Sequence, residues 1–203
     1  MPALSELFSN ARAQRIPVIR DDSAKLLREY VESHHPAKIL EIGTAVGCSG
    51  ILMLTASPNA ELVTVEIDPD RFEQAKQNFA AFGVSHRVRQ ILDDCTAVVR
   101  YLESKFDLIF LDGPKAQYPD MLPYLIPLIR ENGALFADDV SFFGAVDGTD
   151  MPPHKNRTII LELRRFKQML LSDDRFDVTC YDTTDGTLIA VKKYDRRNTK
   201  EVI

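Results

Sequence analysis

Apolar runs alternate with amphipathic segments along the whole chain. Short runs rich in β-branched residues are followed by segments whose apolar residues recur every three or four positions. In the segment 21–34, for example, this spacing places Leu26, Leu27, Tyr30 and Val31 on one face of a helix that begins with acidic capping residues. The runs predict strands at 38–43, 61–68, 88–92, 106–112, 133–138, 176–182 and 186–193. The periodic segments predict helices at 48–56, 70–82, 95–103, 118–129 and 158–171, after an N-terminal helical stretch.

Strands that are separated by single helices imply right-handed crossovers and a mostly parallel sheet. The strand segments are continuous apolar runs, as expected for strands covered by helices on both faces. The last two runs flank the turn sequence TTDG at 183–186 and predict a hairpin. We therefore expect one α/β domain over residues 1–203, with a Rossmann-like sheet, an N-terminal helical segment at 1–35 and a frayed tail at 194–203.

The composition is that of an ordinary globular protein. Hydrophobic residues make up 45% and charged residues 27% of the 203 positions. No run approaches the roughly 20 apolar residues of a membrane span, and the N-terminus lacks the features of a signal peptide. The three cysteines form no C-x-x-C pair, which favours reduced thiols over a disulfide framework or a zinc site. We therefore expect a cytoplasmic protein that does not associate with membranes.

Carboxylates follow the strands of the predicted parallel sheet. In such a sheet, ligands bind beyond the carboxyl ends of the strands. The ends of the first five strands carry Glu41, Glu66, Asp93 with Asp94, Asp112, and Asp138 with Asp139. A scaffold without a ligand has little reason to carry acids at all five ends, so this edge of the sheet is the predicted site.

The loop after the first strand contains Gly43, Gly47 and Gly50. Its spacing is G-x-x-x-G-x-x-G, wider than the G-x-G-x-x-G of dinucleotide-binding loops. Glu41, inside the strand, suits a cationic amine better than a pyrophosphate, and Glu66 stands where a carboxylate can accept ribose hydroxyls. Together these features favour an adenosine ligand with an ammonium or sulfonium centre over NAD. A tight strand–helix turn without a ligand is the structural alternative.

Asp138 and Asp139 are adjacent acids at the end of an apolar run. Two like charges beside a buried strand repel each other and resist desolvation. The pair therefore either holds a ligand or points into water.

Four stretches of the chain resemble the class I S-adenosylmethionine-dependent O-methyltransferases of the catechol and caffeoyl-CoA type: ILEIGTAVGCSG, VEIDPDRFEQAKQNF, FDLIFLDGPKAQY and ADDVSFFG. More narrowly, the chain resembles the bacterial branch that includes tRNA 5-hydroxyuridine methyltransferase. The resemblance runs from about residue 15 to residue 192. It implies a seven-stranded sheet whose last strand is antiparallel.

The resemblance implies S-adenosylmethionine as the cofactor. Glu66 would hold its ribose, and Asp94 with Cys95 would flank its adenine. The family's usual Gly-Asp or Gly-Ala reads Asp93-Asp94 here, and a plain buried role for Cys95 is an equal alternative. By position in the family, the cofactor-binding residues are Glu41, Gly43, Thr44, Gly47, Ser49, Glu66, Asp94, Cys95 and Asp112.

The resemblance also implies a divalent cation, Mg²⁺ or another, bound by Asp112, Asp138 and Asp139. Hard oxygen donors suit Mg²⁺. Lys115 matches the family's general base, and Asp112 belongs to the catalytic set with it. Asp139 stands where the family usually has Asn. Three ionised ligands would leave such a site with one negative charge in excess.

The acceptor side would contain Tyr118, Phe142, Phe143 and Asp182. The acceptor would be a phenolic, catechol-like small molecule or 5-hydroxyuridine of tRNA, because both offer neighbouring oxygens for chelation. The cations Lys155, Arg157, Arg164 and Arg165 form either a basic rim for tRNA or a solvated helix face, and the net charge of −5 weakly disfavours a large phosphate-binding surface.

Two other functions and the formation of a homodimer stay open at this point. An NAD-dependent oxidoreductase would bind nicotinamide, and a non-catalytic S-adenosylmethionine-binding module would bind without turnover. The family is often dimeric, which makes the segment 3–14 a candidate homodimer contact.

Overall fold

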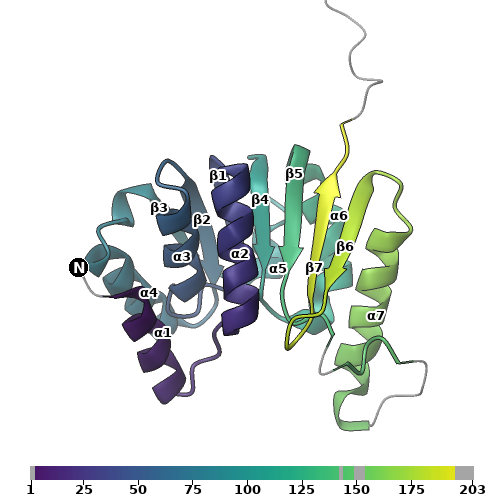
Figure 1. The fold of residues 1–203 in the computed structure, drawn as a ribbon, viewed down its shortest axis with the longest axis horizontal. Helices are drawn as coiled ribbons and strands as arrows, with labels where there is room; N and C mark the ends of the chain where they lie inside the picture. Colours follow the sequence, from purple (N-terminus) through teal and green to yellow (C-terminus); the bar gives the residue numbers. More distant parts are fainter. Residues whose placement is uncertain (1–2, 142–143, 149–153, 195–203) are drawn as a thin grey trace, which may run out of the picture.

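The chain folds around one seven-stranded sheet (Figure 1). The computed structural model describes residues 3–141, 144–148 and 154–194. The strand order is β3-β2-β1-β4-β5-β7-β6, and β7 runs in the direction opposite to the other six strands. The predicted Rossmann-like, mostly parallel sheet with an antiparallel last strand is confirmed. The strands are β1 (Lys38–Ile42), β2 (Glu61–Glu66), β3 (Val88–Leu92), β4 (Phe106–Leu111), β5 (Ile129–Ala137), β6 (Phe176–Tyr181) and β7 (Thr187–Lys192).

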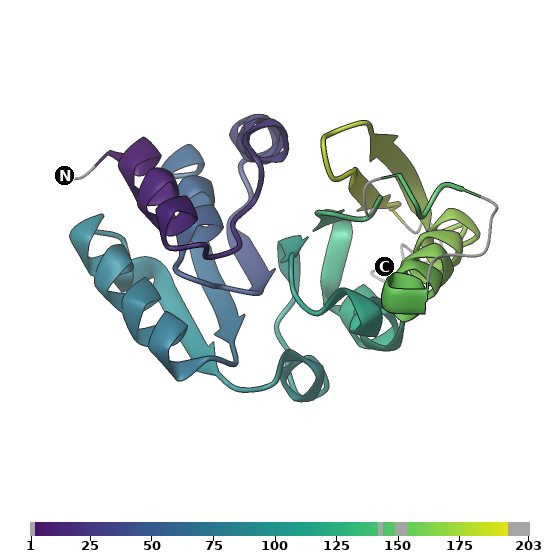
Figure 2. The ribbon, with the colours of Figure 1, turned by 90° about the horizontal axis from the view of Figure 1, so that it is seen from below.

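Helices cover both faces of the sheet, as the continuous apolar strands predicted. Because β1, β2 and β3 follow one another toward one edge, right-handed crossovers place their helices on a single face, and the return to β4 moves the chain to the other face. In Figure 2, α1, α2 and α3 lie above the sheet and α5 lies below it. One apolar core forms beneath α1 (Leu4–Ala13), α2 (Asp21–His34), α3 (Cys48–Ala56) and α4 (Pro69–Ala81), and the other beneath α5 (Cys95–Val98), α6 (Tyr118–Leu128) and α7 (Arg157–Leu171).

Two predicted elements differ from the observed ones. The helix predicted at 95–103 ends at Val98, because Arg100 and Tyr101 bond back three residues and close turns instead. The strand predicted from residue 133 begins at Ile129, and its pairing with β4 shifts register before it becomes regular.

The N-terminal helical segment is built from α1 and α2. Phe8 and Ala11 of α1 are buried in the core of this chain. The homodimer contact through 3–14 stays a prediction. No helix in the described part of the chain is long and apolar enough to cross a membrane.

Candidate active site

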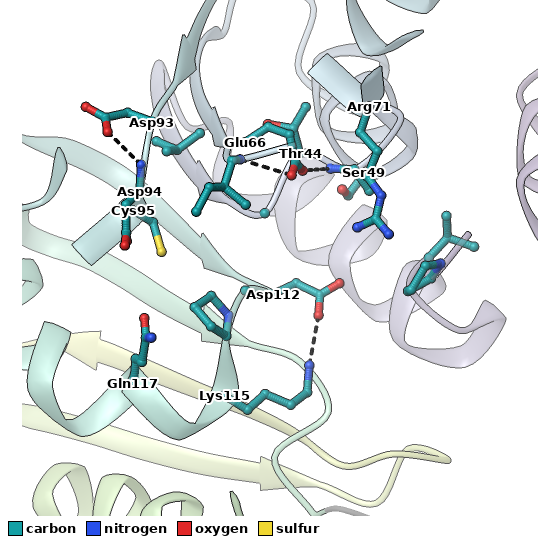
Figure 3. Close-up of a pocket in the computed structure, with 18 of the residues that line it drawn as sticks. Thr44, Ser49, Glu66, Arg71, Asp93, Asp94, Cys95, Asp112, Lys115 and Gln117 are labelled. Carbon is teal, nitrogen blue, oxygen red and sulfur yellow. Dashed lines mark hydrogen bonds and ion pairs between the residues drawn. The ribbon is translucent and has the colours of Figure 1, made fainter. Parts of the chain in front are cut away.

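A cavity of about 420 Å³ opens at the carboxyl ends of β1, β2, β3 and β4 (Figure 3). This is the edge at which the acids following the strands predicted a site. The predicted residues that line it are Gly43, Thr44, Ser49, Glu66, Asp94, Cys95, Asp112 and Lys115. Residues far apart in the sequence therefore share one cavity, because the parallel strands bring their ends to one edge.

The glycine loop brings the ends of β1 and β4 together. A side-chain carbon on Gly43 would lie 2.3 Å from the main-chain oxygen of Asp112, and the φ angle of Gly43 is +99°. Only glycine combines this close approach with this backbone conformation. The loop thereby holds Asp112 against the cavity wall. Gly47, with φ +86°, begins α3 and packs over Phe79 rather than lining the cavity.

Glu66 fixes the loop from the neighbouring strand. Its carboxylate accepts hydrogen bonds from the main-chain N–H groups of Ala45 at 2.7 Å, Ile67 at 3.0 Å and Asp68 at 2.9 Å. These three donors hold the carboxylate in one orientation at the cavity wall. Because a carboxylate offers about four acceptor positions, lone-pair capacity remains for a ligand hydroxyl.

Glu41 lies one layer behind the cavity and is fully buried. The hydroxyl of Ser49 donates to it at 2.5 Å and that of Thr64 at 2.6 Å. Burial raises the pKa of Glu41 to about 7, although both hydroxyl groups favour its ionised form. Among the described residues, Ser49 links this buried acid directly to the cavity wall.

The far end of the cavity is formed after β3. Asp94 caps α5 by accepting hydrogen bonds from the N–H and the hydroxyl of Thr96, and these bonds lower the pKa of Asp94. Cys95 is buried, and burial raises the pKa of its thiol to about 11. The thiol is therefore protonated and chemically quiet at neutral pH. The three cysteines are free thiols, as predicted.

Lys115 joins two of the predicted metal ligands. Its ammonium lies 3.2 Å from Asp112 and 3.2 Å from Asp139. Burial alone would lower the pKa of Lys115, but Tyr118 and the two carboxylates outweigh burial and raise that pKa above its ordinary value. Burial also raises the pKa values of Asp112 and Asp139, and Lys115 opposes this rise. In the protein alone, one ammonium ion therefore neutralises part of a crowded acidic cluster.

Asp138, the third predicted metal ligand, is only 3% exposed. It accepts a hydrogen bond from the hydroxyl of Thr187 at 3.2 Å, and Thr187 in turn contacts the hydroxyls of Ser23 at 3.1 Å and Thr183 at 2.9 Å. An ionised carboxylate only accepts, so Thr187 donates to Asp138. A side-chain hydrogen bond from Ser23 also favours the ionised form of Asp138. Burial, with a contribution from Asp112, raises the pKa of Asp138 to about 6.

The predicted ligands of the cation are Asp112, Asp138 and Asp139. Within the described ranges, no three acidic, histidine or cysteine side chains are assembled as a ready metal site. Asp112 and Asp139 nevertheless already share one cation, the ammonium of Lys115. Their oxygen donors are of the kind that Mg²⁺ prefers. The donor set therefore fits a hard divalent cation chemically, although its carboxylates are oriented around Lys115.

Two of the predicted acceptor-side residues, Tyr118 and Asp182, lie away from the cavity. Tyr118 is 0% exposed, donates to the main-chain oxygen of Leu111 at 3.2 Å and packs edge-on against Phe166. It is a core residue, because α6 turns its first residue inward between β4 and α7. Asp182 is exposed and does not line the cavity. Phe142 and Phe143 lie outside the described residues.

Asp185, which the sequence did not single out, is the acid of the β6–β7 turn that lies close to the cluster. It is 7% exposed and accepts a hydrogen bond from Arg20 at 2.5 Å, while its other oxygen has no partner among the described residues. Its main-chain oxygen accepts from Ser141, and that of Gly186 accepts from Val140. The turn therefore anchors the loop that follows Asp138 and Asp139. An acid beside a hairpin glycine was the only sequence signal for it.

The cavity also has walls that the sequence did not predict. Pro17 and Val18, between α1 and α2, and Arg71, in the first turn of α4, line it. No motif marks the first two. Arg71 could have been noticed as a cation five residues after Glu66.

The cations of α7 are occupied within the protein. Arg164 donates to the main-chain oxygens of Ala145 at 2.9 Å and Val146 at 3.0 Å. Arg165 pairs with Asp120 at 3.4 Å and Glu162 at 3.2 Å. These contacts favour a solvated helix face, whose cations pair within the protein, over a basic rim that binds phosphates.

Known proteins resemble this chain in both sequence and fold. The sequence pattern of the O-methyltransferase family matches residues 3–193. The chain belongs to this family. The catechol O-methyltransferase of Niastella koreensis is 28% identical over 182 residues, which cover 87% of this chain and 78% of that protein.

Solved O-methyltransferases superimpose on nearly the whole chain. The enzyme TomG of Streptomyces achromogenes, solved with S-adenosylmethionine, is 28% identical, with a TM-score of 0.85 over 96% of this chain and 91% of that one. The Bacillus cereus enzyme, solved with S-adenosylhomocysteine, is 25% identical, with a TM-score of 0.83 over 95% of this chain and 93% of that one.

The match extends to the type of enzyme. The chain is a class I, S-adenosylmethionine-dependent O-methyltransferase by family, of the catechol and caffeoyl-CoA type. The family decides against the NAD-dependent oxidoreductase, which the spacing of the glycine loop already disfavoured.

Proposed function

We propose that this O-methyltransferase methylates a hydroxyl group of a catechol-like small molecule, with a divalent cation held by Asp112, Asp138 and Asp139. The observation that carries the proposal is the position of Lys115, 3.2 Å from both Asp112 and Asp139 at the edge of the cavity. A lysine side chain and carboxylates that can take a cation therefore meet beside the proposed cofactor site.

Different walls of the cavity would contact different parts of the cofactor. Asp94 and Cys95 would flank the adenine, and the fixed carboxylate of Glu66 would accept from the ribose. The loop from Gly43 to Ser49, with Thr44 and Gly47, would enclose the methionine half. Glu41, behind Ser49, would supply negative charge for its ammonium group, because a buried acid with a pKa of about 7 ionises readily beside a cation.

Lys115 would receive the proton that the acceptor hydroxyl loses. In the protein alone, Asp112 and Asp139 keep Lys115 charged. If these carboxylates turned to a dication, Lys115 would lose both partners, and its burial would then favour the neutral amine that can act as a base. Asp112, Asp138 and Asp139 would hold the dication, which would supply Lewis acidity that acidifies the acceptor hydroxyl.

A small acceptor fits the surface better than tRNA does. Arg164 and Arg165, the helix cations that would face a phosphate backbone, are paired with carbonyl groups and carboxylates of the protein. A nucleic-acid surface needs cations that are available to phosphates.

The test is a methyl-transfer assay with a matched pair of acceptors. The purified enzyme is given S-adenosylmethionine with 3,4-dihydroxybenzoate, or with 4-hydroxybenzoate, which lacks the neighbouring hydroxyl. We expect methylation of the first only, loss of activity in EDTA and recovery with Mg²⁺. Asp112→Ala should abolish turnover.

Full activity of Asp112→Ala in the presence of EDTA would refute the cation. Transfer to unmethylated tRNA, without transfer to the catechol, would refute the small acceptor. Tight S-adenosylhomocysteine binding without turnover on either acceptor would favour the non-catalytic module.

A further inference from the structure

We propose that Arg71 is the receptor for the carboxylate group of the cofactor's methionine half. The inference rests on the proposed use of the cavity for S-adenosylmethionine, and it adds a residue that neither the motifs nor the glycine loop indicated. Its basis is the position of Arg71 and the distribution of charge in the cavity.

The start of α4 holds Arg71 at the cavity wall. The carboxylate of Asp68 caps this helix by accepting from the N–H of Asp70 at 2.9 Å and of Arg71 at 3.2 Å. The side chain of Arg71 lines the cavity. In Figure 3 its guanidinium group lies close to Ser49 and away from Asp94 and Cys95. Arg71 therefore faces the methionine end of the proposed cofactor site.

The charges around the cavity require a cation for an anionic ligand group. Four acids line the described wall, and the lining cations are Arg71 and Lys115. A carboxylate entering this cavity would be repelled unless a positive charge met it. Lys115 is held by Asp112 and Asp139 at 3.2 Å. The four acids are Glu66, Asp93, Asp94 and Asp112.

Arg71 is the cation that remains available. Its ion pair is with Asp68, at 3.7 Å, and the two side chains are 42% and 41% exposed. An exposed pair at that distance contributes little, so a ligand can replace it. The planar guanidinium group presents paired donors that match the two oxygens of a carboxylate.

The neighbouring elements favour an anion at the same corner. Ser49 lies in the first turn of α3, which spans nine residues, and the N-terminus of such a helix carries partial positive charge. The adenosine half would occupy the opposite end, near Asp94 and Cys95. A ligand carboxylate at this corner would thus lie between Arg71 and the start of α3.

The experiment compares three adenosine ligands by calorimetry. S-adenosylhomocysteine has both the ammonium and the carboxylate group, its decarboxylated analogue keeps only the ammonium, and 5′-methylthioadenosine has neither. The variants are Arg71→Met, which keeps a long apolar chain, and Arg71→Lys. Lys76→Met is the matched control, because it removes one exposed positive charge from the same helix outside the cavity. Thermal unfolding by circular dichroism verifies that each variant is folded.

We expect Arg71→Met to weaken S-adenosylhomocysteine binding about tenfold. This is the lower end of the range of effects for a hydrogen bond to a charged group, because the side chain of Arg71 is partly exposed. Binding of the decarboxylated analogue and of 5′-methylthioadenosine should not change. Arg71→Lys should keep part of the preference for the carboxylate, and Lys76→Met should bind like the wild type.

Two results would overturn the assignment of Arg71. Equal weakening of all three ligands would place Arg71 at the adenosine half or in the framework of the site. No change for any ligand would leave Arg71 as a surface partner of Asp68. If the wild-type protein bound none of the three ligands, the proposed cofactor site itself would fail, which is a different result from either.

Discussion

Replacing Glu41 by Gln should make the protein more stable above pH 7 and weaken its binding of the cofactor. Glu41 is fully buried, and its two oxygens accept from Ser49 at 2.5 Å and Thr64 at 2.6 Å. Gln has the same shape. Its oxygen can accept from Ser49, and its amide group can donate to Thr64, whose own proton can turn to Thr44 at 2.5 Å. The variant therefore removes the charge and keeps the packing.

The magnitude follows from the pKa of Glu41. Burial raises that pKa from 4.5 to about 7, so the folded protein holds this proton more tightly than the unfolded chain does. The difference corresponds to about 3 kcal/mol. The contribution of protonated Glu41 to stability is fully present below pH 4.5 and is lost as the pH rises to about 7. Between these pH values, the wild-type protein should therefore lose about 3 kcal/mol of unfolding free energy through Glu41. Glu41→Gln should lose none of it through this position.

The assay is urea denaturation at pH 5 and pH 8, followed by circular dichroism because the chain contains no Trp. The measured quantity is the difference between variant and wild type, since other carboxyl groups also titrate. Glu61→Gln, which removes a charge from an exposed position, is the control and should behave like the wild type. Calorimetry with S-adenosylhomocysteine should show weaker binding by Glu41→Gln, because the ammonium group of the ligand loses its counter-charge. If wild type and Glu41→Gln lost the same free energy between the two pH values, Glu41 would be ionised in the folded protein already at pH 5, and the reasoning would be refuted.

Three further substitutions test the framework of the site. Thr187→Val removes the hydroxyl that orients Asp138 and should lower the affinity for Mn²⁺ about tenfold in calorimetry, with Thr187→Ser restoring it; an unchanged affinity would show that Asp138 needs no such support. Gly43→Ala should destabilise the fold by at least about 2 kcal/mol in urea, because the new methyl group would lie 2.3 Å from the main-chain oxygen of Asp112 at a φ of +99°; a wild-type midpoint would mean that the loop relaxes. Tyr118→Phe should lower the unfolding free energy by about 1–2 kcal/mol and leave methyl transfer by the folded enzyme intact, whereas lost transfer without lost stability would return Tyr118 to the acceptor side.

The alternation of apolar runs and periodic segments was sufficient to predict the sheet and its layers. That information is local: a run such as 106–111 is apolar because both of its faces are covered, and the helices beside it show their buried stripe every three to four residues. The acids at the strand ends could be predicted for the same reason, since parallel strands bring those ends to one edge wherever the strands lie in the sequence.

The sequence could not show which side chains at that edge contact one another. Lys115 was expected to be a base, and only the fold shows that it holds Asp112 and Asp139 together in the protein alone. Tyr118 was assigned to the acceptor because it follows the Asp112–Lys115 motif, but the packing of α6 against α7 directs it into the core.

The largest gap concerns contacts between distant parts of the chain. Arg20 pairs with Asp185, and Ser23 contacts Thr187 beside Asp138, across more than 160 positions. No periodicity or motif encodes which hydroxyl meets which carboxylate, because such contacts depend on where α2 and the last hairpin come to rest on the sheet. The sequence by itself determined the elements, the order of the acids and the family resemblance. The tertiary structure decided which charges are buried, paired or free, because burial and distance are properties of the packed chain.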